Sequence, residues 1–281
     1  MAVKFEAQLP QSIPASVNVY KLQPANVTNA ELLKRSKGFG LTGRGKDFIS
    51  GSESLAYREG RFHLEAHLKS GAIHYRHLDK YGRVPEKKFD LTDRRAGTVA
   101  RKFLETANLF PIGTAQQRAI THLHSAVADI KTKQIKEEII DAGVVYGRIV
   151  DDLPVDGPGG FALVNVDPDA EVIGMRSIWR GLGKRQAKVK VKAADEIMKQ
   201  FERQAAKFKG DTTVKKAGFS YFEHGPLDEQ TVLEPAFWFV YVVNYKDVTH
   251  KSAFVVHAGD KTFGQLIGKK RFPSPDQKRR K

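Results

Sequence analysis

Cysteine is absent from this 281-residue chain, and its absence excludes several kinds of chemistry. Disulfide bonds, thiol catalysis and cysteine-bound zinc all require the missing side chain. Long apolar runs are absent too, since no window reaches the roughly 18 apolar residues that a membrane-spanning helix needs. The first residues, MAVKFEAQLPQSIP, lack the continuous apolar core of a signal peptide. We therefore expect a soluble, cytoplasmic protein without a transmembrane segment.

The motifs of common enzymes are also missing. The chain has no Gly-x-Ser-x-Gly elbow, no His-Glu-x-x-His helix, no Walker loop and no Gly-x-Gly-x-x-Gly that follows a strand and opens a helix. Asp151, Asp152 and Asp156 could serve as acid or base carboxylates, but aspartates in Gly- and Pro-rich turns commonly hydrogen-bond their own backbone. A non-enzymatic protein without a cofactor is favoured, and an enzyme with a dispersed site is the alternative.

Positive charge is what the chain has in excess. It contains 47 Lys and Arg against 32 Asp and Glu, a formal net charge of +15. Such an excess raises the local concentration of anionic partners and speeds encounter with them, whether they are nucleic acids, acidic peptides or membrane surfaces. The charge predicts an anionic partner without identifying it.

Three strand-like runs, Val144–Val150, Phe161–Val166 and Glu171–Trp179, form the best-defined part of the sequence. Pro- and Gly-rich or Asp-Pro-Asp segments separate them, as expected for the turns of a β-meander. Pro235–Asn244 is the most continuously apolar segment and predicts a central strand buried on both faces, with Ser252–His257 as its hairpin partner.

Apolar residues at three- and four-residue intervals predict helices over Val27–Lys37, Thr92–Asn108 and about 193–208. Thr28 and Glu31 have the spacing of a capping box. Between the second helix and the meander, residues 115–143 favour a strand followed by a short connector.

These elements predict an α+β protein of two domains, each an antiparallel sheet covered by one or two helices. An N-terminal arm (1–16) precedes domains over 17–142 and 143–268, and a basic, disordered tail follows (269–281). The predicted core consists of Phe103, Leu104, Val164, Ile197, Phe201, Trp238, Val240 and Val242.

The densest imidazole cluster lies on the predicted hairpin of residues 61–78. His63, Glu65 and His67 alternate along one strand and so share a face, where they could bind a divalent metal. A solvated polar sheet face explains the same spacing, and we expect no tightly bound metal.

The second half of the chain resembles the PepSY-like modules of bacterial regulatory and propeptide proteins. The matching features are the turn at 167–170, the strand residues 172–174, the helix at 193–208 and the segment 233–235. The resemblance implies a small, non-catalytic α+β module, over residues 144–257, that binds or restrains a protein partner. It implies no active-site residues.

The predicted binding surface lies where a strand meets the densest basic run, so that an aromatic anchor adjoins a charged rim. Its residues are Trp179, Arg180, Lys184, Arg185, Lys188 and Lys190. The favoured function is a binding or scaffold protein that recognises an acidic peptide or protein segment, such as a precursor peptide or a partner enzyme, by pairing it with a sheet edge. A nucleic-acid-binding protein is the main alternative, and a homodimer through a sheet edge is also open.

Overall fold

The chain forms two compact units built from non-contiguous segments. The structure, a computed structural model, describes residues 3–44, 47–109, 114–128, 131–132, 134–208, 210–245 and 248–266. Unit 1 comprises Met1–Tyr20, Arg185–Ser220 and Val232–Lys281, and unit 2 comprises Lys21–Lys184 and Tyr221–Thr231. The division differs from the expected boundary near residue 143, which falls inside strand β8 (Ile135–Val150).

The predicted α+β fold class is wrong. The described residues form fifteen strands, hydrogen-bonded into a mixed sheet, and only three helices. β1 (Lys4–Phe5) and β9 (Leu153–Asp156) both run parallel to β13 (Asp211–Phe222), so the sheet is not purely antiparallel. The sequence patterns identified local hairpins, but a parallel pair joins segments that are distant in sequence and leaves no local signal.

Unit 2 holds a sheet whose order is β9-β8-β10-β11-β6-β5-β4-β3, with β7 paired to β8. The strands not yet delimited are β3 (Phe48–Ser50), β4 (Ser54–Glu59), β5 (Phe62–His67), β6 (Ile73–His77), β7 (Ala115–Ala128), β10 (Phe161–Val166) and β11 (Val172–Ile178). β10 pairs antiparallel with both β8 and β11, which confirms the central meander.

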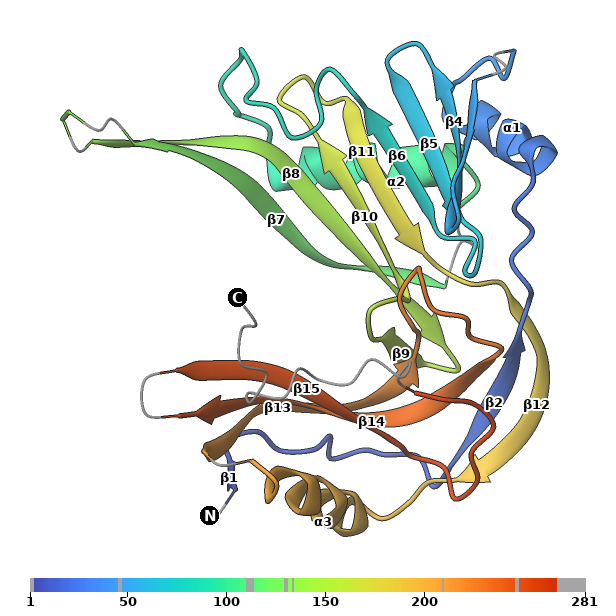
Figure 1. The fold of residues 1–281 in the computed structure, drawn as a ribbon, viewed down its shortest axis with the longest axis vertical. Helices are drawn as coiled ribbons and strands as arrows, with labels where there is room; N and C mark the ends of the chain where they lie inside the picture. Colours follow the sequence, from blue (N-terminus) through green and yellow to red (C-terminus); the bar gives the residue numbers. More distant parts are fainter. Residues whose placement is uncertain are drawn as a thin grey trace, which may run out of the picture. The chain divides into compact units, whose positions relative to one another are not determined.

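Residues 115–143 were predicted as a strand and a connector, and the second half of that prediction is wrong. β7 and β8 instead form a long antiparallel hairpin, from Ala115 opposite Arg148 to Ala128 opposite Ile135. The sequence did not show this strand because its first residues, before Ile139, are mostly polar and mostly exposed. The buried part of β8 begins at Ile140, and the far end of the hairpin extends away from the rest of the sheet (Figure 1).

Two helices pack against the unit 2 sheet: α1 (Asn29–Gly38) on β4 and β5, and α2 (Asp93–Thr106) on β7, β8, β10 and β11 (Figure 1). Thr28 and Thr92 are their N-caps, and each hydroxyl accepts the backbone N–H three residues on. This side-chain bond satisfies one of the free N–H groups of a helix start.

Unit 1 holds the order β12-β2-β14-β13, with β15 paired to β14 and β1 to β13. Its further strands are β2 (Ser16–Leu22), β12 (Leu182–Lys190), β14 (Val232–Asn244) and β15 (Thr249–His257). The predicted hairpin of Pro235–Asn244 with Ser252–His257 is confirmed, with Ala236 opposite His257 and Asn244 opposite Thr249. The expected N-terminal arm contains β1, and the expected tail, 269–281, lies outside the described residues.

The helix α3 (Ala194–Ala205) lies along one face of this sheet (Figure 1). Phe201 is one of its buried residues. The Phe201 ring lies 5.0 Å from Phe239, 5.5 Å from Tyr241 and 5.6 Å from Phe254, centroid to centroid. Aromatic pairs at such distances add to the free energy of burial, so Phe201 anchors the helix to β14 and β15.

The prediction that β14 is buried on both faces holds as far as Phe237 and is wrong beyond it. Phe237, Phe239, Tyr241 and Val243 are buried, whereas Trp238, Val240 and Val242 between them are only half-buried. Of the predicted core, Leu104, Val164, Ile197 and Phe201 are fully buried and Phe103 is partly buried. β14 therefore has one face under α3 and a second, partly exposed apolar face around Val240, which we call the open face. Among the described residues, no helix is long and apolar enough to span a membrane.

Candidate binding surfaces

The predicted aromatic anchor, Trp179, follows β11 and is half-buried. The Arg148 guanidinium lies over its ring at 5.5 Å from the centroid, a cation–π distance. Trp179 also lines a cavity of about 500 Å³ in unit 2, together with Ser177 and Gly181.

Arg180, predicted beside it as a binding residue, is only 3% exposed. Its guanidinium donates to the carbonyl oxygens of His224, Gly225 and Asp228, at 2.9, 2.8 and 2.6 Å. These bonds direct Arg180 into unit 2, where it holds the segment after β13 and does not reach a surface partner.

A buried ionic cluster surrounds this arginine. The Glu223 carboxylate, 0% exposed, accepts the Arg180 backbone N–H at 2.8 Å, and its other oxygen lies 3.6 Å from Nη1 of Arg148. Arg148 also donates to the Arg180 carbonyl oxygen at 2.7 Å. Burial raises the pKa of Glu223 and lowers the pKa of both arginines, while their opposite charges act in the other direction. One carboxylate thus joins two guanidinium groups in a site closed to solvent.

The Gly-rich segment 157–160 forms the wall of this cluster. The Gly159 N–H donates to the Glu223 carbonyl oxygen at 3.0 Å, and a Cβ at Gly159 would overlap the carbonyl oxygen of His224. Before it, Asp151 and Asp152 have φ values of 48° and 63°, as the two central residues of a type I′ hairpin turn require. The third aspartate, Asp156, accepts a hydrogen bond from the Arg118 guanidinium at 2.7 Å. The glycines and aspartates of this region therefore have structural roles.

The four basic residues of the predicted surface lie on β12, a strand that the sequence did not predict. Lys184, Arg185, Lys188 and Lys190 are all exposed. Lys184 belongs to unit 2 and the other three to unit 1.

The helix α3 begins after this strand with acidic residues. Asp195 and Glu196 occupy its first turn, where negative charge interacts favourably with the helix macrodipole.

The histidine face of β5 contains a competing cation. Arg76 lies 3.7 Å from the Glu65 carboxylate and donates to the His74 ring at 3.0 Å. Burial, together with Arg76, lowers the pKa of His74 to about 4, and burial lowers the pKa of His63. Among the described residues, no group of three His, Cys, Asp or Glu side chains is placed to hold a metal, and His63, Glu65 and His67 form no such group.

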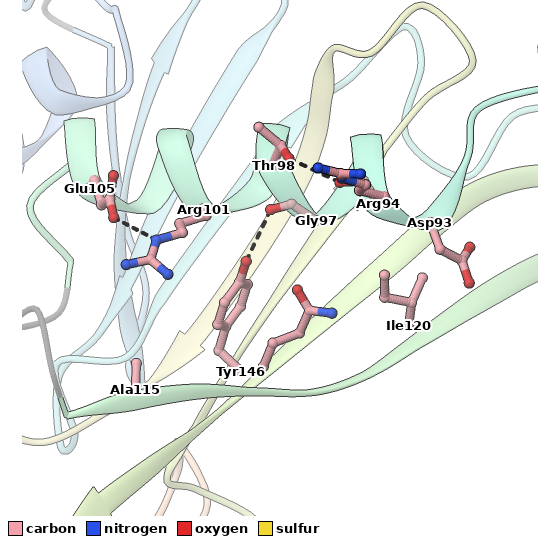
Figure 2. A pocket seen from close by; sticks show the side chains of 10 residues that line it. Asp93, Arg94, Gly97, Thr98, Arg101, Glu105, Ala115, Ile120 and Tyr146 are labelled. Carbon is pink, nitrogen blue, oxygen red and sulfur yellow. Dashed lines mark hydrogen bonds and ion pairs between the residues drawn. The ribbon is translucent and has the colours of Figure 1, made fainter.

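A second cavity in unit 2, of about 610 Å³, lies between α2 and the β7–β8 hairpin (Figure 2). The Tyr146 side chain lines it, and the Tyr146 hydroxyl donates to the Gly97 carbonyl oxygen at 3.1 Å. Two arginines, Arg94 and Arg101, line it with Asp93 and Glu105, and Arg101 is already paired to Glu105 at 2.8 Å. Balanced charges give this cavity no preference for an anionic ligand.

The open face of the unit 1 sheet is the surface that sequence reasoning missed. Trp238 lies over Gly218 of β13, where a Cβ would overlap its indole ring. Val240 faces Ala253 and Trp238 faces Val255 across the β14–β15 pair. The available signal was weak: Val240 and Val242 alternate with Phe239 and Tyr241, but Trp238 interrupts the alternation of large and small side chains.

Comparison with known proteins gives a fold and no function. No family model matches the chain, and no curated protein matches it. Among solved structures, it is similar to an uncharacterized protein from Eubacterium rectale ATCC 33656, whose crystal structure was determined at 1.45 Å resolution. The TM-score is 0.56 at 11% identity, over 95% of this chain and 91% of the other. The similarity supports the fold alone, and the PepSY-like resemblance stays a prediction.

Proposed function

We propose that this protein is a non-enzymatic binding protein, and that unit 1 recognises an acidic segment of a peptide or protein partner. The partner is a precursor peptide or an enzyme that carries such a segment. This role agrees with the partner-binding role that the PepSY-like resemblance implies.

The uneven division of charge carries the proposal. Unit 1 holds 21 Lys and Arg against nine Asp and Glu, whereas unit 2 holds 26 against 23. Unit 1 therefore holds 12 of the chain's 15 net positive charges, six of them in residues 269–281, which lie outside the described residues. A surface with one dominant sign concentrates partners of the opposite sign and speeds their association.

Two features of unit 1 favour a peptide over a nucleic acid. The first is a strand, β15, that pairs only with β14 among the described strands, since a free edge can hydrogen-bond an extended peptide. The second is the open apolar face around Val240, because apolar side chains of a peptide can continue such a face. Nucleic-acid binding would depend mainly on phosphate contacts and base stacking.

Fluorescence anisotropy with the full chain tests the proposal. The probes are a labelled glutamate-rich peptide and a labelled single-stranded oligonucleotide, each titrated at low and physiological salt. We expect saturable peptide binding with modest salt dependence. Charge reversal at Arg185 and Lys188 should weaken it about tenfold, whereas Lys102→Glu, an exposed lysine of unit 2, should leave it unchanged.

The oligonucleotide arm decides the alternative. Tighter binding of the oligonucleotide than of the peptide, with affinity that falls more than about tenfold between the two salt concentrations, would assign the charge to phosphate contacts. Equal losses in the unit 1 and unit 2 variants would show that only net charge matters, and would remove unit 1 as the recognition surface.

A further inference from the structure

We propose that the outer edge of β15 is the docking site, and that it adds one strand from an extended, acidic segment of a partner protein. This inference rests on the proposed function and specifies where and how the partner binds. The segment has acidic and apolar residues in alternation.

The direction of the β15 backbone defines the edge. Ala258 donates its N–H to the Pro235 carbonyl oxygen at 3.0 Å, which sets the alternation of inward and outward groups along the antiparallel pair. The backbone N–H and C=O groups of Ser252, Phe254 and Val256 therefore point toward β14. The N–H and C=O groups of Lys251, Ala253 and Val255 point away from it.

Lys192 marks one end of the site. Its Nζ donates to the His257 carbonyl oxygen at 3.3 Å, the next outward group after Val255. The open stretch of the edge accordingly runs from Lys251 to Val255. No described strand pairs with it.

The side chains beside this edge select the character of the partner. Lys251 and Ala253 are exposed and Val255 is half-buried, and all three share the open face with their β14 neighbours. A strand added here would place alternate side chains next to Ala253 and Val255, where apolar groups extend the face. The residues between them, acidic in an alternating segment, would lie on the other face of the added strand and gain from the positive excess of unit 1.

A free sheet edge can bind either a second copy of this chain or a segment of another protein, and the charge of unit 1 favours the second. A second copy of this chain would bring the same positive excess to the edge, since unit 1 has 21 cationic against nine anionic residues. A net charge far from zero keeps proteins monomeric, so it opposes such a pairing. An acidic segment meets no such repulsion.

The first arm of the test removes one outward N–H. Ala253→Pro deletes a donor that β14 does not use, and proline is tolerated where the N–H of an edge strand faces outward. The matched control is Ala253→Thr, which keeps the N–H. The probe is a labelled octapeptide of alternating glutamate and valine. We expect about tenfold weaker binding to Ala253→Pro and unchanged binding to Ala253→Thr, with folding of both verified by circular dichroism.

The second arm leaves the protein unchanged, so it holds even if Ala253→Pro does not fold. Two versions of the octapeptide carry N-methyl groups on alternate residues, one on the glutamates and one on the valines. Strand addition uses only every second N–H of the peptide, so one version should lose about tenfold in affinity and the other should not.

The outcomes separate the docking mode from the proposed function. Peptide binding that is equal in all variants and both methylated versions would overturn the β15 site and leave acidic-segment recognition standing. No peptide binding at all would overturn both, and would leave Lys251 as a residue that guards the edge against aggregation. Self-association seen by sedimentation, and abolished by Ala253→Pro, would replace the peptide with a second copy and overturn the proposal.

Discussion

Units 1 and 2 use their positive charges differently. In unit 2 the cations are matched by acids: Arg118 pairs with Asp156, and Lys80 contacts both Asp167 and Glu171 at 2.7 and 2.6 Å. In unit 1 the cationic residues outnumber the acidic ones by more than two to one. The contrast teaches that net charge alone does not locate a binding surface. Only the cationic groups that internal ion pairs do not neutralise can attract an anionic partner.

The sharpest way to break this comparison is to remove the acid at the centre of unit 2. Glu223→Gln leaves the guanidinium groups of Arg148 and Arg180 buried without a carboxylate, so we expect a loss of about 3–5 kcal/mol in the free energy of unfolding. Urea denaturation followed by tryptophan fluorescence measures it. The control is Glu171→Gln, whose side chain is 60% exposed and should matter far less. Similar small losses in both variants would mean that the buried cluster is not structural.

A somewhat smaller effect is expected from the wall of the same cluster. In Gly159→Ala the new methyl group meets the carbonyl oxygen of His224, and overpacking of this kind costs about 1–3 kcal/mol. Gly225→Ala is the matched control, since a Cβ there has its nearest neighbours at 3.5 Å. The two melting temperatures give the comparison, and equal values would show that the loop yields without cost.

Removing one cation from each unit tests the comparison directly. Arg118→Gln breaks a partly exposed ion pair of unit 2 at 2.7 Å, and we expect it to destabilise the fold by up to about 1 kcal/mol. Lys188→Gln in unit 1 removes an exposed charge with no carboxylate partner among the described residues, so stability should change by less than about 0.5 kcal/mol. Denaturant midpoints measured side by side would contradict the contrast if Lys188→Gln were the more damaging variant.

The smallest expected effect concerns the pH dependence of stability. Burial raises the pKa of Asp141, whose carboxylate accepts from Asn165 at 2.9 Å. Because the folded-state pKa lies above the unfolded one, the stability contributed by this group is full below the unfolded pKa and is lost as pH rises through the folded pKa. Asp141→Asn should therefore reduce the pH dependence of the free energy of unfolding between the unfolded and folded pKa values of Asp141, and should raise that free energy at neutral pH. Thermal unfolding from pH 4 to 8 measures the slope, and an unchanged slope would rule out Asp141 as its source.

Local patterns predicted several parts of the site's surroundings. Alternation identified the β14–β15 hairpin, and periodicity identified α3 with Ile197 and Phe201 as its buried residues. The basic run was correctly seen as exposed, although it lies on a strand. The second half of β12 alternates, with Val189 buried between exposed Lys188 and Lys190, and this strand signal was overlooked because the segment was interpreted only as a basic run.

The sequence by itself determined the elements whose causes are local: the caps at Thr28 and Thr92, the stripe of α2, and the turns between the central strands. Tertiary structure alone decided which charged side chains are buried in ion pairs and which are exposed to solvent. Arg180 and Lys184 look alike in the sequence, but Arg180 meets Glu223, 43 residues away, and is buried. Burial of a charge depends on partners brought together by the fold, and no local pattern encodes them.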